Sequence, residues 1–260
     1  MILLAGGGAF EGGFMTLIIA LILIFVITLL VIFMRKRIFP IFYLMYVRVF
    51  RGKYSFEYLE FFKKHDLRNP LNNCIRDEIT IHFSVFFKLL KEASQYKTDI
   101  PIEFKDVPYL ISYRKLVKQF GTPQCINIAR FNQSRVKVVG YNEKFQEKKM
   151  KSLFYFIDDQ FVMGEFVFSE TRRMDPTQVK EVLSQKYLDG ETLKSDVIYI
   201  LGPQGNMLNY HDNGFFAAVK YLYRGDDHLN EIMNNIFAQA HENGKAFKRA
   251  MIQEELLNRF

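Results

Sequence analysis

Residues 153–168 read LFYFIDDQFVMGEFVF. Two nearly continuous apolar runs, at 153–157 and 161–168, flank the triplet Asp158-Asp159-Gln160. Apolar runs of this length, rich in aromatic and β-branched residues, are typical of buried β-strands, and Asp is a turn former. We therefore predict strands at 150–157 and 161–168 that are joined by a tight hairpin.

Further strand patterns lie on both sides of this hairpin. The segment SRVKVVGYNE (134–143) alternates basic and apolar side chains, as a half-buried strand does. Turn-forming residues at 202–206 and 211–214 separate three more apolar stretches. The additional predicted strands are 124–131, 135–142, 196–201, 206–211 and 214–223. Together these segments predict an antiparallel β-meander.

Helical patterns flank the predicted meander. Tyr109–Phe120 precedes Gly121-Thr122-Pro123, a glycine-then-proline stop signal. Asp175-Pro176 stands in the N-cap and N1 order of a helix that we expect to reach about Leu188. Asp226-Asp227 is expected to cap a final helix running toward Phe260. The fold class that follows is α+β.

Two more helices are predicted nearer the N-terminus, at 54–66 and 71–95. The second helix carries an apolar stripe at helical spacing, formed by Ile75, Ile79, His82/Phe83, Phe86 and Leu90. We interpret His82 as a core or boundary histidine, because a histidine within such a stripe is more often hydrogen-bonded there than bound to a ligand.

Two helix ends in the predicted α+β region look alike. KLVKQF-GTP (115–123) and EVLSQKY-LDG (181–190) are each followed by antiparallel strands. This helix–turn–β-meander pattern resembles modules of the β-lactamase-inhibitor-like group, over residues 109–223 at most. The resemblance implies a protein-binding sheet without catalytic residues.

The segment Phe14–Met34 reads FMTLIIALILIFVITLLVIFM, 21 residues without a charge, Pro or Gly. At about 1.5 Å per residue its length approaches the roughly 30 Å hydrocarbon core of a bilayer. We predict a single N-terminal transmembrane helix. The alternatives are a buried core helix and a cleaved signal peptide, but the preceding residues carry no basic side chain and RKR follows the run.

The charges beside this segment predict an orientation. Residues 35–68 contain nine basic and three acidic side chains, net +6, whereas the whole chain carries +7. The positive-inside rule then places the chain in the inner or plasma membrane, with the N-terminus outside and the C-terminal domain cytoplasmic. In that compartment Cys74 and Cys125 are expected as reduced thiols and small buried residues.

The segment after the predicted span mixes aromatic and basic residues, which suits a layer of anionic lipid headgroups. We expect Pro40 to kink or restart the helix there. The candidate membrane-surface residues are Arg35, Lys36, Arg37, Phe39, Phe42, Tyr43, Tyr46, Arg48, Arg51 and Lys53. The predicted organisation is a Gly-rich flexible outer tail (1–13), the span (14–34), a basic-aromatic juxtamembrane region (35–96), the α+β domain (97–225) and a C-terminal helix (226–260).

The sequence contains no catalytic signature. Its five histidines form no HxH or HExxH pattern, no phosphate-binding GxxxxGK[ST] loop occurs, and no Ser lies in a GxSxG context. Asp158 and Asp159 are interpreted as turn residues, and His211-Asp212 as a solvated turn. We therefore expect no catalytic residue, cofactor or metal site. Nucleic-acid binding is not expected, because residues 69–260 have a net charge of only +2.

These observations favour a non-enzymatic, single-pass protein whose cytoplasmic α+β domain binds a protein partner, as an accessory or scaffold subunit of a membrane complex. The alternative is a membrane-bound enzyme or binding domain for a hydrophobic or lipid-derived small molecule. A third hypothesis is an adaptor that binds anionic lipid through its basic juxtamembrane residues.

Overall fold

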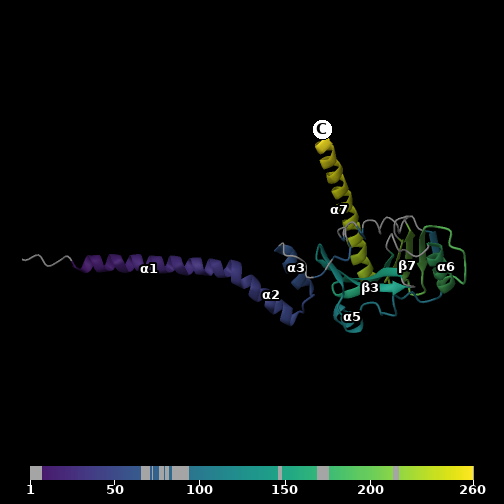
Figure 1. The fold of residues 1–260 in the computed structure, drawn as a ribbon, viewed down its shortest axis with the longest axis horizontal. Coiled ribbons are helices and arrows are strands. Elements are labelled where there is room, and N and C mark those ends of the chain that lie inside the picture. The colour runs from purple at the N-terminus through teal and green to yellow at the C-terminus, as the bar shows by residue number, and fades with distance from the viewer. Residues whose placement is uncertain are drawn as a thin grey trace, which may run out of the picture. The chain divides into compact units, whose positions relative to one another are not determined.

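The computed structural model describes residues 8–65, 71, 73–75, 79, 82–83, 94–145, 148–168, 176–212 and 217–259 (Figure 1). The chain divides into two compact units, Met1–Arg68 and Asn69–Phe260.

The smaller unit is helical. Helix α1 (Gly8–Phe33) continues through a π-helical turn, η1 (Met34–Ile38), into α2 (Phe39–Phe50), and α3 (Phe56–Lys64) follows a turn. The N–H of Phe39 donates to the carbonyl of Met34, five residues back. Pro40 stands in the first turn of α2, where its missing N–H is tolerated. The chain was predicted to kink or restart its helix at Pro40; it stays helical there, and the helix type changes at Phe39, one residue earlier.

The transmembrane prediction is wrong. Over the residues that the structure describes, none of the helices combines the length and the hydropathy that a bilayer crossing requires. This finding overturns the prediction of a single-pass topology with a transmembrane helix at 14–34. It also overturns the predicted inner or plasma membrane location, with the N-terminus outside and the C-terminal domain in the cytoplasm.

The larger unit is built on an eight-stranded mixed sheet in the order β1-β6-β7-β8-β5-β4-β3-β2. Strands β2 to β5 form one meander and β6 to β8 a second, and the two join where β5 pairs antiparallel with β8. The strands are β1 (Ser94–Lys97), β2 (Cys125–Phe131), β3 (Ser134–Phe145), β4 (Lys148–Ile157), β5 (Gln160–Phe168), β6 (Val197–Leu201), β7 (Met207–Asp212) and β8 (Ala217–Leu222). The α+β class and the predicted meander strands are confirmed.

The sheet is mixed, and the prediction of a purely antiparallel sheet is wrong in this respect. Strand β1 pairs parallel with β6, with Ser94 opposite Ile198. Ser94 and Gln95 had been assigned to the end of the helix predicted at 71–95, most of which lies outside the described residues. The segment 97–108, predicted as the start of a domain, lies inside the larger unit.

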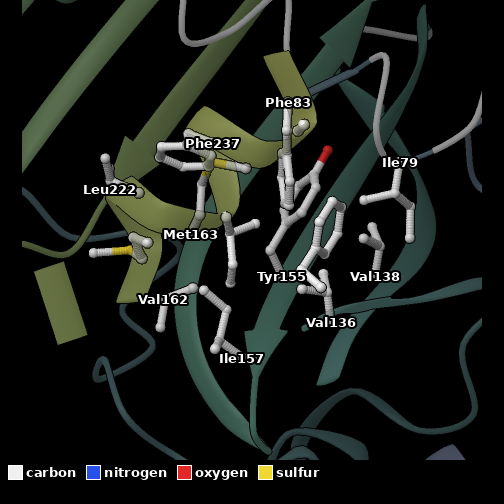
Figure 2. Close-up of a cluster of buried hydrophobic side chains, with 14 of the residues drawn as sticks. Ile79, Phe83, Val136, Val138, Tyr155, Ile157, Val162, Met163, Leu222 and Phe237 are labelled. Carbon is white, nitrogen blue, oxygen red and sulfur yellow. The ribbon is translucent and has the colours of Figure 1, made fainter. Parts of the chain in front are cut away.

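Different segments of the chain pack on the two faces of the sheet. On one face, residues of α7 (Asp227–Arg259) and the side chains of Ile79 and Phe83 pack on apolar residues of the strands (Figure 2). The opposite face contacts α5 (Tyr113–Phe120) and α6 (Pro176–Tyr187), as the ring pair Tyr113–Phe156 and the contact of Lys180 with Tyr210 show. We call the face under α7 the α7 face.

Several predicted turns and caps are confirmed. Asp158 and Asp159 connect β4 to β5 with φ of 46° and 71°, a left-handed conformation that Asp tolerates in tight hairpins. Gly121 ends α5 with φ 80°. Asp226 accepts a hydrogen bond from the N–H of Leu229, 2.8 Å away, and so caps α7.

Cys74 and Cys125 form a disulfide across 51 residues, with a Cα–Cα distance of 4.8 Å. The expectation that both cysteines are buried is confirmed, and the expectation of reduced thiols is wrong. That expectation rested on the cytoplasmic location, which has itself been withdrawn. Beside the bridge, Asn127 accepts hydrogen bonds from the N–H groups of Cys74 (2.6 Å) and Ile75 (3.1 Å), so β2 holds this segment at two points.

Candidate functional site

A buried ion pair lies on the α7 face, at the junction of the two meanders. Glu165 of β5 stands directly opposite Lys220 of β8 in the antiparallel ladder. The Lys220 Nζ is 2.8 Å from the Glu165 Oε1. The side chain of Lys220 is 4% exposed and that of Glu165 is 1% exposed. Burying two charges is costly unless they are paired and hydrogen-bonded, so this pair is the most demanding electrostatic feature of the sheet.

The second carboxylate oxygen of Glu165 also has partners. His82 Nε2 lies 3.1 Å from Glu165 Oε2, and the Tyr155 hydroxyl donates a hydrogen bond to the same oxygen. The Tyr155 hydroxyl is also 2.9 Å from His82 Nε2, and the two rings are stacked at 5.8 Å. Both oxygens of the carboxylate are therefore satisfied. We call Glu165, Lys220, His82 and Tyr155 the buried polar cluster.

The backbone positions each member of the buried polar cluster. The β4–β5 register shifts at a β-bulge between Tyr155 and Phe156: Tyr155 pairs with Met163 and Phe156 pairs with Phe161, which leaves Val162 as the extra residue. Bulges re-aim side chains next to functional or strained sites. In Figure 2 the Tyr155 ring lies beside Phe83, with its hydroxyl directed out of the apolar cluster. His82, adjacent to Phe83, therefore lies at the boundary of the core with hydrogen-bond partners, as its place in the apolar stripe predicts.

The protein environment shifts the pKa values of Glu165 and Tyr155 in opposite directions. Burial alone would raise the pKa of Glu165, but the charge of Lys220 and the interaction with His82 hold it below the ordinary value. Burial, followed by the negative charge of Glu165, raises the pKa of Tyr155 well above its ordinary value. Glu165 stays ionised and Tyr155 stays protonated near neutral pH. Neither the Glu165 carboxylate nor the Tyr155 hydroxyl is therefore adjusted to exchange a proton near neutral pH.

Two further polar residues extend the cluster along β7. Asn209 faces Lys220 across the β7–β8 ladder and is 2% exposed. Its Nδ2 donates to the carbonyl of Ile198 at 3.1 Å, while its Oδ1 has no hydrogen-bond partner among the described residues. His211 belongs to β7 and is 7% exposed, so the prediction of a solvated turn at His211-Asp212 is wrong. Burial, and then the charge of Lys220, lower the pKa of His211.

The candidate membrane-surface residues all belong to the smaller unit. Arg35 lies in η1, and Phe39, Phe42, Tyr43, Tyr46 and Arg48 lie in α2. Arg51 and Lys53 follow in the turn before α3, and the side chains of Lys36 and Arg37 lie outside the described residues. The four aromatic residues are 49–65% exposed. Their contact with lipid headgroups stays a prediction.

Sequence reasoning missed the buried polar cluster apart from His82. The available signal was a single charge inside an apolar strand: Glu165 in FVMGEFVF and Lys220 in AAVKYL. Charged residues are almost never fully buried unless they are paired. Two such strands therefore indicate a cross-strand ion pair.

Over the described residues, no group of three or more His, Cys, Asp or Glu side chains could hold a metal ion. Comparisons with known protein families, with curated proteins and with solved structures found no match.

Proposed function

We propose that the protein is a non-enzymatic accessory or scaffold subunit of a protein complex, and that apolar helices of a partner enclose α1. The observation that supports this proposal is the exposure of α1. Its large apolar side chains from Ile19 to Phe33 are 47–63% exposed. Outside the smaller unit, the exposed large apolar side chains of the described residues are only Ile100, Leu110 and Val182.

The exposure is the same on every side of the helix. Leu21, Ile22, Leu23 and Ile24 point in directions about 100° apart, and their exposed fractions are 59%, 57%, 59% and 60%. A helix that is apolar all round requires cover all round. A single partner helix would cover one side and leave the others in water, so more than one helix must surround α1.

The energetic argument points the same way. Complete burial of one aliphatic side chain is worth about 1.5–3 kcal/mol. Leaving this whole run in water would cost more than the ~5–15 kcal/mol that stabilises a typical domain. The only described polar side chain in the run, Thr28, donates to the carbonyl of Ile24 at 2.7 Å. A partner therefore has to offer apolar contacts and no hydrogen-bonding groups.

Site-specific photo-crosslinking tests this proposal. A benzophenone amino acid replaces Leu21, Ile22, Leu23 or Ile24 in four separate full-length variants expressed in cells. Val182 of α6, which is 51% exposed, is the matched control position. We expect protein adducts within apolar helical segments of a partner from all four α1 positions, and none from Val182.

Two outcomes would overturn the proposal. Adducts to lipid alone at the four positions would mean that no protein encloses the helix. Adducts only to a second copy of this chain, from one or two of the four positions, would indicate a self-dimer through one face.

A further inference from the structure

A groove of about 680 Å³ lies between α2 and α3, within the smaller unit. Its volume is within the range of sites that hold one small molecule. The residues that line it are Arg35, Phe39, Pro40, Tyr43, Glu57, Glu60, Phe61, Lys63, Lys64 and His65.

The groove has an aromatic wall that the protein leaves uncovered. Arg35, Phe39 and Tyr43 recur at intervals of four residues and share one face of the helix. The Tyr43 and Phe61 rings lie 6.1 Å apart across the two helices, and the Phe61 ring lies 4.3 Å from the His65 ring in a tilted arrangement. Phe39 is 64% exposed. An apolar segment of a ligand would cover these rings.

Basic side chains from two different elements line the same groove as this wall. Because the turn at 51–55 reverses the chain, Arg35 of η1 and the last turn of α3 line the same groove. Lys63 and Lys64 in that last turn complement the dipole of α3. This role does not explain why Arg35, which lies in η1, also lines the groove. The acidic lining residues Glu57 and Glu60 already interact with other residues of the protein.

An apolar wall and basic side chains in one groove match an amphiphile with an anionic head. We propose that the α2–α3 groove binds a single-chain amphiphile with a phosphate monoester head, with the alkyl chain on Phe39, Tyr43 and Phe61 and the phosphate at Arg35, Lys63 and Lys64. A phosphate dianion fits several cations better than a carboxylate does, because it offers more charge and more acceptor oxygens. This inference does not depend on the role of α1.

The chain contains no tryptophan, so one introduced indole reports on the groove alone. The experiment uses full-length Tyr43→Trp protein, with Phe61→Trp as a second reporter in case one substitution perturbs the site. The probes are octyl phosphate, octanoate, octanol and inorganic phosphate, each below its micelle concentration. We expect saturable fluorescence changes with octyl phosphate, binding about tenfold weaker with octanoate, and weaker still with octanol or inorganic phosphate.

Substitutions then locate the head and the chain. In the reporter background, Arg35→Met and Lys64→Met should each weaken octyl phosphate binding about tenfold and leave octanol binding unchanged. Lys245→Met removes the same charge from α7 and should have no effect. A Phe25→Trp reporter on α1 separates saturable binding in the groove from general association of alkyl chains with that helix.

Three results would overturn the inference. Equal affinity for octanol and octyl phosphate would show that the groove has no anion site. Equal affinity for inorganic phosphate and octyl phosphate would show that the aromatic wall does not bind the alkyl chain. Unchanged octyl phosphate binding in both Arg35→Met and Lys64→Met would show that these cations do not contact the head.

Discussion

Gly140 of β3 stands opposite Cys125 of β2, and the space where a side chain of Gly140 would be is occupied by the disulfide. A Cβ built on Gly140 would collide with the Cys125 Sγ and would lie 3.0 Å from the Cys74 Sγ and 2.9 Å from Leu153 Cδ2. The strand pair therefore accommodates the bridge only because residue 140 has no side chain.

Gly140→Ala is expected to lower the free energy of unfolding by about 1–3 kcal/mol, because an extra methyl group overpacks the core beside the sulfurs. Urea denaturation measures the change. The same substitution in a Cys74→Ala/Cys125→Ala background should cost less, since the sulfur atoms are absent. An equal loss in both backgrounds would show that the collision with Leu153 alone is responsible.

Loss of the disulfide should lower the free energy of unfolding by about 4 kcal/mol, because the bridge closes a loop across 51 residues and so restricts the unfolded chain. Urea denaturation with and without dithiothreitol measures this loss. The Cys74→Ala/Cys125→Ala variant is the control, and its transition should not respond to the reductant. Identical wild-type transitions under both conditions would contradict the prediction.

Glu165→Gln should lower the free energy of unfolding by about 3–5 kcal/mol, because Lys220 is then left as an uncompensated buried charge. The double variant Glu165→Leu/Lys220→Met removes both charges and should recover most of the loss. A double-mutant cycle by urea denaturation, made of Glu165→Leu, Lys220→Met and the double variant, gives the interaction energy. Additive losses from the two single substitutions would mean that the pair does not act as a unit.

The free energy of unfolding should fall as the medium is acidified, in two separate windows. Burial lowers the pKa of His211, so below about pH 6.5 the unfolded chain takes up a proton that the folded chain resists, and stability decreases. Glu165 has a lowered pKa, so its contribution is fully present above the unfolded value of about 4.3 and is lost as the pH falls through the folded value.

Chemical denaturation between pH 3 and pH 8 separates the two contributions. His211→Gln should flatten the dependence just below about pH 6.5, and Glu165→Gln should flatten it below about pH 4.3. If His211→Gln has the same slope as the wild type in the upper window, the titration of another group is responsible.

The local patterns predicted most of the sheet, whereas the long-range contacts were not predicted. The apolar runs, Asp158-Asp159 and Gly121 marked strands, hairpin and helix end correctly because these signals act within a few residues. The parallel pairing of β1 was missed because Ser94–Lys97 is short and polar. The buried polar cluster requires His82, Tyr155, Glu165 and Lys220 to meet, and no local spacing encodes that meeting.

The ion pair between Glu165 and Lys220 also restricts how the two meanders can be joined. Side chains alternate between the faces of a sheet, so sliding β8 by one residue would turn Lys220 toward the opposite face and place Val219 or Tyr221 opposite Glu165. Both charges would then be buried and separated, at a cost that no gain in apolar contact on that seam would offset. The ion pair thus fixes the register of β8 against β5. If the β2–β5 and β6–β8 meanders were produced as two separate polypeptides, they would have one register in which to recombine.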